Sequence, residues 1–315
     1  MTIHDVNRLL ARTINVCPNL GSELESGYTI DLTAREFDLF RQAGFSAVRL
    51  GVYWAAHCGG APDFRIAPQA LDRVHAYLDL AAERDLAVVL TNFLDPDLIA
   101  NPPQQMPRLL SITDQVVTAF ADRPRSVVLE PFTEPRDALD PLWNDTLRAL
   151  LAVVRAADTE RAVVFGPGAY NNLRMLPQLS LPDDPNLIVT IHQYWPITFT
   201  MQGEEWLGTD NPFGDPRSWL GTTWTGTDQQ RGELTAGYAG LAAWAAANDR
   251  PIFVGEFGTS TNADTASRAR WTDFNRRLAE EHGFSWGCWS FAPVFSLYDL
   301  ETQRWNQPLL RALMD

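Results

Sequence analysis

The sequence contains no lysine, so all 25 of its basic residues are arginines, and they stand against 39 acidic residues. The resulting net charge of −14 repels phosphates, so neither nucleic acid nor an anionic membrane is an expected partner. Cysteine is also scarce: Cys17, Cys58 and Cys288 are an odd number without metal-site spacing. Cys17 and Cys288 lie in apolar runs, and we expect both to be buried in the core.

Long apolar runs are missing as well. No run approaches the roughly 20 residues that span a bilayer. Residues Met1 to Asn15 show no basic segment followed by an apolar stretch, which a secretory signal would require. We therefore expect a cytoplasmic protein, whereas secretion would require a leader ahead of this sequence. Nothing in the composition predicts an oligomeric state.

Eight short apolar runs recur along the chain, and most are rich in β-branched residues. They are Ile14–Leu20, Ala47–Val52, Ala87–Phe93, Val127–Phe132, Ala162–Phe165, Leu187–Tyr194, Ile252–Phe257 and Phe284–Phe291. Most are continuously apolar rather than alternating, which is typical of parallel strands buried on both faces.

Segments with helical periodicity separate these runs. They are Ala34–Ala43, Pro68–Arg84, Leu109–Ala121, Leu142–Ala157, Leu234–Asn248 and Thr265–His282. Alternation of eight strands with helices predicts a single α/β domain over residues 1–315, a closed (β/α)₈ TIM barrel. The absence of a G-x-G-x-x-G motif after the first strand disfavours a dinucleotide-binding sheet. The long irregular stretch Trp195–Gln230 is expected to lie over the catalytic face of the barrel.

Two glutamates stand in unusual places. Glu134 follows the fourth apolar run, and Glu256 lies near the end of the seventh. A carboxylate that closes a buried strand is costly unless it is paired or functional, and a strand-end salt bridge is the alternative for either one alone. The fourth and seventh strands of a barrel face each other across its mouth, so the two acids can flank a substrate. Glycoside cleavage uses such a pair, with one proton donor and one nucleophile.

Short motifs occur in a characteristic order and spacing over nearly the whole chain. They are Ala47-Val-Arg49, Thr133-Glu-Pro135, Ile191-His-Gln-Tyr194, Phe199-Thr-Met-Gln-Gly203, Val254-Gly-Glu-Phe-Gly258 and Trp286-Gly-Cys-Trp-Ser-Phe291. The sequence thereby resembles glycoside hydrolase family 5, which belongs to a clan of retaining (β/α)₈ glycosidases. The resemblance implies hydrolysis of a β-glycosidic bond in a carbohydrate or small glycoside, with no metal or organic cofactor.

Individual roles follow from the resemblance, position by position. It makes Glu134 the acid/base and Glu256 the nucleophile. Arg49 would lie near the nucleophile and favour its ionised form. His192 and Tyr194 are two residues apart on one strand and share a face; they would contact the acid/base and the nucleophile, respectively.

Tryptophans are expected around the sugar. The resemblance makes Trp289 the aromatic platform beneath the sugar at the point of cleavage. Further candidate stacking surfaces, for each of which plain packing is the alternative, are Trp54, Trp195, Trp206, Trp219 and Trp224.

The chain departs from the family pattern at the sugar-contacting positions. Thr133 replaces an asparagine that contacts the 2-hydroxyl of the cleaved sugar, and threonine has no amide to do so. Phe93 and Leu94 replace a pair of histidines, and Met201 stands where the family often has histidine. Loss of several polar groups from one side of a pocket predicts a changed ligand.

Three interpretations remain open at this point. The pocket can accept a sugar that lacks or masks hydroxyls, it can hydrolyse ordinary β-glycosides slowly, or it can bind carbohydrate without hydrolysis. A transglycosylase or tailoring enzyme acting on a small intracellular glycoside is a further alternative. Retention of Arg49, Glu134, His192, Tyr194, Glu256 and Trp289 favours an active glycosidase.

Overall fold

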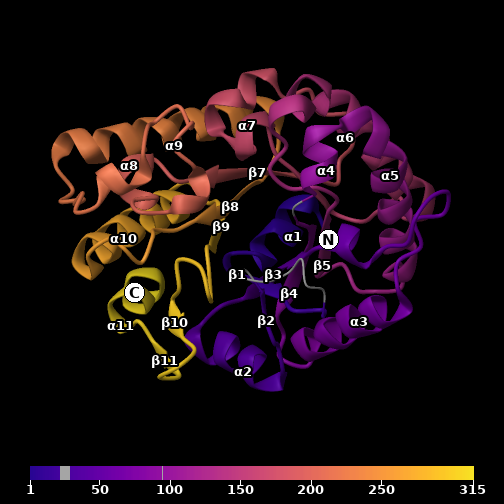
Figure 1. Cartoon of the computed structure of the whole chain (residues 1–315), viewed down its shortest axis with the longest axis horizontal. Helices are drawn as coiled ribbons and strands as arrows, with labels where there is room; N and C mark the ends of the chain where they lie inside the picture. The colour runs from indigo at the N-terminus through magenta and orange to yellow at the C-terminus, as the bar shows by residue number, and fades with distance from the viewer. Residues whose placement is uncertain (22–28, 94) are drawn as a thin grey trace.

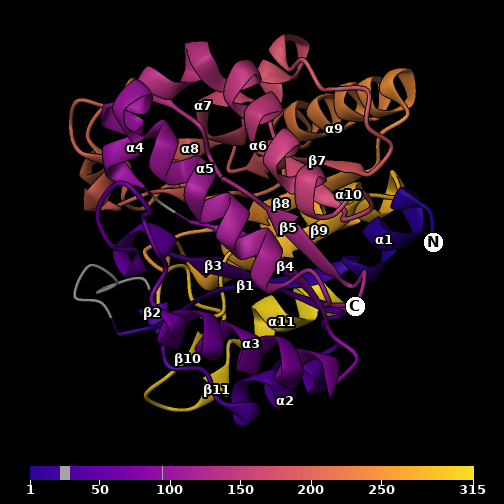
Figure 2. The same cartoon turned by 90° about the vertical axis from the view of Figure 1, so that its right-hand side faces the viewer.

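The computed structural model describes residues 1–21, 29–93 and 95–315. Eight parallel strands form a barrel in the order β1-β3-β4-β5-β6-β7-β8-β9, and pairing of β9 with β1 closes it. The helices surround these strands as an outer layer (Figures 1 and 2). The (β/α)₈ barrel expected from the sequence is confirmed.

The barrel strands agree closely with the apolar runs of the sequence. They are β1 (Arg12–Pro18), β3 (Ala47–Val52), β4 (Ala87–Asn92), β5 (Val127–Glu130), β6 (Val163–Phe165), β7 (Leu187–Gln193), β8 (Ile252–Phe257) and β9 (Ser285–Cys288). Nearly every residue in them is buried, as burial on both faces requires. A two-residue strand, β2 (Thr29–Ile30), pairs with β1, and β10 (Tyr298–Asp299) forms a hairpin with β11 (Arg304–Trp305).

Several helices begin at a recognisable capping residue. Thr33 and Glu36 form a capping box on α2, which ends at Gly44 with a left-handed φ of 100°. The helices are α1 (Ile3–Leu9), α2 (Ala34–Ala43), α3 (Pro68–Ala82), α4 (Pro96–Ala100), α5 (Pro102–Ala119), α6 (Trp143–Ala157), α7 (Gly168–Asn171), α8 (Ile197–Thr200), α9 (Asp228–Asn248), α10 (Thr265–Glu281) and α11 (Gln307–Met314). In the described part of the chain, no helix combines the length and apolar character needed to cross a bilayer.

Helix α1, which the sequence pattern did not predict, lies against one end of the barrel. Val6 and Leu10 form one apolar cluster with residues from several strands, including Ala47 and Phe253. The amide of Asn7 also donates a hydrogen bond to the carbonyl of Ile252 at 3.0 Å. Because these contacts involve the first residues of β3 and β8, α1 covers the amino-terminal end, and the opposite end is left for a site.

Candidate active site

The two glutamates lie at the carboxyl ends of β5 and β8. Strand β5 ends at Glu130, earlier than the expected Phe132, so Glu134 stands four residues beyond the strand. Its backbone is left-handed, with a φ of 52°, which is uncommon for a residue with a side chain. Glu256 is the last but one residue of β8 and is buried. The surrounding structure therefore holds both carboxylates in fixed positions.

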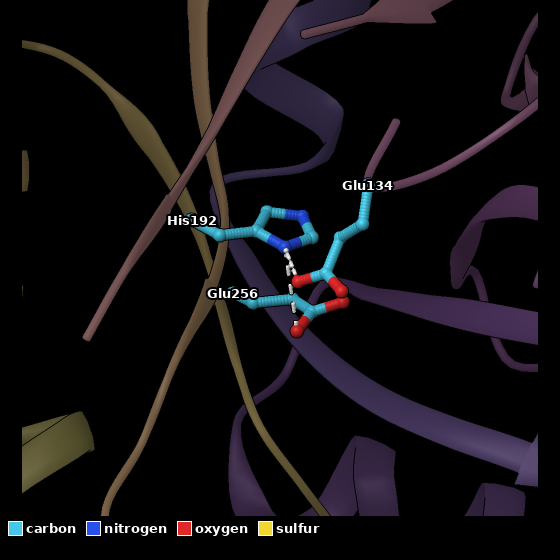
Figure 3. A group of neighbouring side chains, drawn as sticks. All are labelled: Glu134, His192 and Glu256. Carbon is cyan, nitrogen blue, oxygen red and sulfur yellow. Dashed lines mark hydrogen bonds and ion pairs between the residues drawn. The ribbon is translucent and has the colours of Figure 1, made fainter. Parts of the chain in front are cut away.

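A ring nitrogen of His192 points toward both carboxylates (Figure 3). Its Nδ1 is 2.7 Å from Glu134 Oε1 and 3.5 Å from Glu256 Oε2. A shift of register between β7 and β8 pairs His192 with Glu256 across the two strands. One carboxylate oxygen from each glutamate and a ring nitrogen of His192 all lie within 4.8 Å of one another.

Arg49 joins the nucleophile candidate to the neighbouring strands. From β3, its Nη1 donates to Glu256 Oε1 at 2.7 Å and to Asn15 Oδ1 at 2.9 Å. Its Nε donates to Glu130 Oε2 at 2.6 Å, and its Nη2 to Thr133 Oγ1 at 2.8 Å. The guanidinium is 1% exposed, so these charge-assisted bonds form away from water, where they are strong.

The charges of this group shift the proton affinities of its members. Burial lowers the pKa of Arg49, but the attraction of Glu130 and Glu256 outweighs burial and raises it. Burial likewise lowers the pKa of His192, and Glu256 and Glu134 reverse that effect and raise it. Burial and the same two carboxylates raise the pKa of Tyr194 well above its usual value. Tyr194 therefore stays neutral and donates its hydroxyl proton to Glu256 Oε2 at 2.8 Å.

The raised pKa of His192 predicts a pH-dependent contribution to stability. Because its folded-state pKa lies above the unfolded value of about 6.5, the contribution is complete below that value and is lost as the pH rises through the folded pKa. We expect the free energy of unfolding of the wild type, minus that of His192→Asn, to fall with rising pH. Urea denaturation of both proteins from pH 5 to 9 measures this difference. His4→Asn, at an exposed histidine, is the control, and a difference for His192→Asn that stays constant with pH would contradict the prediction.

An apolar wall lies at Phe93 and Thr133, where the sequence departs from the pattern of the family that it resembles. The ring of Phe93 stacks on Trp289 at 5.4 Å with an interplanar angle of 24° and meets Tyr53 edge-on. Cys17 and Ala56 complete this cluster. Thr133 is 1% exposed, and its hydroxyl already accepts a bond from Arg49, so it offers the sugar no polar surface. Leu94, also singled out from the sequence, lies outside the described residues.

Trp289 is half-buried between two apolar clusters. Besides the wall, it packs against a cluster of Met201, Trp219 and Phe295. Gly258 permits its position, because a Cβ at residue 258 would lie 2.0 Å from the Trp289 carbonyl oxygen. The indole therefore has neighbours that hold it in one orientation.

The remaining tryptophans divide by burial. Trp54 and Trp224 are 1% exposed and pack in the main core, so stacking on sugar is wrong for these two. Trp219 is buried in the cluster beside Trp289. Trp206 is exposed. The Trp195 indole donates to Glu233 and lies under the Arg174 guanidinium.

Three residues near the glutamates were not predicted from the sequence. Glu130 closes β5 and shares Arg49 with Glu256; a charged residue inside the apolar run Val127–Phe132 was a usable signal. Asn171 is buried, and its side-chain nitrogen lies 3.2 Å from His192 Nε2. Tyr170 is half exposed, and the Arg136 guanidinium, which also donates to the Glu134 carbonyl, lies 5.0 Å from its ring centre. Asn171 and Tyr170 had no signal, because only the fold brings them to the site.

A metal ion is an alternative occupant of the Glu134, His192 and Glu256 group. Glu256 already accepts bonds from Arg49 and Tyr194, and His192 Nδ1 lies at hydrogen-bond distance from Glu134. Arg49 also places a positive charge beside the group. These donors fit a hydrogen-bonded acid–base pair better than a cation site, where the oxygens would have to be free.

Comparison with known proteins matches this arrangement to one family. Residues 20–294 match the model of the cellulase family, glycosyl hydrolase family 5. Endoglucanase H of Acetivibrio thermocellus is 27% identical over 97% of this chain, and the cellulase/esterase CelE of the same organism is 25% identical over 97%. The chain spans only 33% and 40% of the length of these two proteins.

Solved structures of the same kind superimpose closely. A hyperthermophilic endo-β-1,4-glucanase in complex with substrate has a TM-score of 0.91 and 33% identity, with 100% of both chains covered. Thermotoga maritima Cel5A in complex with mannotriose has a TM-score of 0.92 and 32% identity, with 99% of both chains covered. With its barrel, its motifs and a family match over most of its length, the chain belongs to glycosyl hydrolase family 5.

Proposed function

We propose that this protein hydrolyses a β-glycosidic bond of an oligosaccharide or small glycoside with retention of anomeric configuration. The observation that carries the proposal is the approach of a Glu134 oxygen to within 4.8 Å of a Glu256 oxygen. Retaining enzymes hold their carboxyl groups about 5–5.5 Å apart, whereas inverting enzymes leave about 6.5–9.5 Å for a water molecule. Family membership and the endoglucanase relatives support a glycosidase.

The contacts of the two acids assign their roles. Glu256 is buried and accepts bonds from the guanidinium of Arg49 and the hydroxyl of Tyr194, which suits it to act as the nucleophile. Its oxygen forms a bond to the anomeric carbon, and the electron pair of the broken bond goes to the leaving oxygen. Glu134 gives that oxygen its proton. Glu134 then takes a proton from water, which attacks the anomeric carbon and releases Glu256 as a carboxylate.

The apolar wall supports a narrower choice of sugar. Phe93 presents a ring where a histidine would donate and accept hydrogen bonds, and the Thr133 hydroxyl is engaged by Arg49. A hydroxyl facing this wall loses its bonds to water and gains none, which is costly. We therefore propose that the sugar at the cleavage point lacks hydroxyls on this side or carries them masked.

A panel of aryl β-glycosides tests both parts of the proposal. We expect 2-deoxy and 6-deoxy sugars, or sugars with masked hydroxyls, to exceed the parent glucoside in kcat/KM by up to about 10²-fold. Proton NMR of the first product formed should show the β-anomer, before mutarotation mixes the two forms. Phe93→His restores a polar side chain. In this variant the ratio of kcat/KM for the deoxy sugars to kcat/KM for the parent glucoside should be smaller than in the wild type.

Several results would contradict the proposal. An α-anomer as first product rules out retention, and equal kcat/KM values across the panel rule out the altered sugar site. Saturable binding of an oligosaccharide with no turnover would favour a carbohydrate-binding barrel. Glycosyl transfer to an added alcohol in preference to water would favour a transglycosylase.

A further inference from the structure

Glu130 is a second buried carboxylate on the arginine that serves the nucleophile. It is 1% exposed, and its Oε2 accepts bonds from Arg49 Nε at 2.6 Å and from the Thr91 hydroxyl at 2.7 Å. Its Oε1 has no hydrogen-bond donor among the residues that the structure describes. Glu130 and Asn92 line a cavity of about 20 Å³, which has room for a water molecule. A buried carboxylate so incompletely satisfied calls for a physical explanation.

Charge balance around Arg49 supplies that explanation. Glu130 and Glu256 both form ion pairs with the same guanidinium, so one positive charge faces two negative charges. Among the described residues, His192 and Tyr194 also face Glu256, and His192 contacts Glu134 as well. The arginine is therefore over-neutralised in the resting protein.

The first step of the proposed reaction changes this balance. When Glu256 bonds to the anomeric carbon, it becomes an uncharged ester. The electron pair of the broken bond takes the proton of Glu134, so the negative charge passes to Glu134, which pairs with His192. Without Glu130, Arg49 would then be a buried cation with no counter-ion, which is a costly state. With Glu130 present, Arg49 loses its ion pair with Glu256 but keeps its ion pair with Glu130, so its charge stays neutralised.

We propose that Glu130 is a positioning residue that acts through Arg49, remaining its counter-ion while Glu256 is esterified to the sugar. This inference rests on the proposed retaining mechanism. Before the attack, Arg49 also stabilises the Glu256 carboxylate less than it would without Glu130, because the two acids share one cation. Both effects lower the barrier to forming the glycosyl-enzyme.

Trapping with an activated 2-deoxy-2-fluoro-β-glycoside measures this step directly. In the wild type the reagent should label Glu256, as detected by mass spectrometry of the intact protein and its peptides. Glu130→Gln keeps the shape and an acceptor for Arg49 but removes the charge. We expect its labelling rate constant to fall at least about 30-fold, as buried charge pairs in close contact are strongly coupled. The labelled variant should lose its sugar at least as fast as the wild type, because its intermediate is less stable.

Two further variants separate charge from structure. Glu130→Asp keeps the charge and should restore labelling to within about tenfold of the wild type. Asp158→Asn removes the acid that pairs with another buried arginine, Arg161, and should leave labelling unchanged. The pH profile of labelling adds a readout that a purely structural role would not move: its acid limb should shift to lower pH in Glu130→Gln.

The outcomes distinguish this inference from the proposed function. If the reagent labels Glu256 in the wild type and labels Glu130→Gln at the same rate, the role of Glu130 is overturned and the proposed function stands. Equal losses in Glu130→Gln and Glu130→Asp, without a shift of the acid limb, indicate a packing role and also overturn it. A wild type that turns over glycosides but is never labelled on Glu256 overturns both.

Discussion

Glu256→Gln is expected to lower kcat at least about 10⁴-fold while leaving the fold intact. Glutamine cannot form the ester, and removal of a covalent nucleophile costs this much or more in other enzymes. The variant should remain folded, because Arg49 keeps Glu130 as its counter-ion and the amide oxygen can still accept a bond. Initial rates on an activated aryl β-glycoside, with circular dichroism as the check of folding, measure the effect.

Chemical rescue distinguishes Glu256 from Glu134 as the nucleophile. Azide added to Glu256→Ala attacks the substrate directly and should give the α-glycosyl azide. Azide added to Glu134→Ala should attack the glycosyl-enzyme and give the β-glycosyl azide. Glu160→Gln, at an exposed acid paired with Arg125, is the control and should keep wild-type activity. A β-azide from Glu256→Ala and an α-azide from Glu134→Ala would show that Glu134 is the nucleophile and Glu256 the acid/base. Near-normal turnover by Glu256→Gln would exclude the mechanism.

Arg49→Met is expected to produce the largest loss of stability of any substitution in the site, about 3–5 kcal/mol at pH 7. Methionine fills much of the volume but leaves Glu130 and Glu256 buried side by side without their shared cation. Asn15 and Thr133 lose a donor as well. Urea denaturation measures the free energy of unfolding.

Two arginine substitutions calibrate this effect. Arg49→Lys keeps the charge but cannot reach several acceptors in a planar fork, so its loss should be intermediate. Arg84→Met removes an arginine whose partners Asp38 and Glu83 are half to two-thirds exposed, and should cost at most about 1 kcal/mol. An Arg49→Met loss as small as that of Arg84→Met would show that the buried network contributes little to stability.

Much of the barrel could be predicted because its signals are local. Strands β3 and β8 have the predicted bounds, since continuous apolar runs are typical of parallel strands buried on both faces. Helix α2 also matches, as its capping residues mark both ends. Helix α1 was missed because it is short, and its apolar residues become informative only against the end of the barrel.

The sequence by itself determined the barrel, its family, and Glu134, Glu256, Arg49, His192 and Tyr194 as the candidate residues, since periodicity and motifs are properties of neighbouring residues. Only the tertiary structure decided what these side chains contact. It brought Glu130 to Arg49 across 81 positions of the chain and Phe93 onto Trp289, and it buried Trp54 and Trp224. The physical reason is that hydrogen bonds, ion pairs and stacking depend on distance in space, which closure of the barrel sets and sequence separation does not.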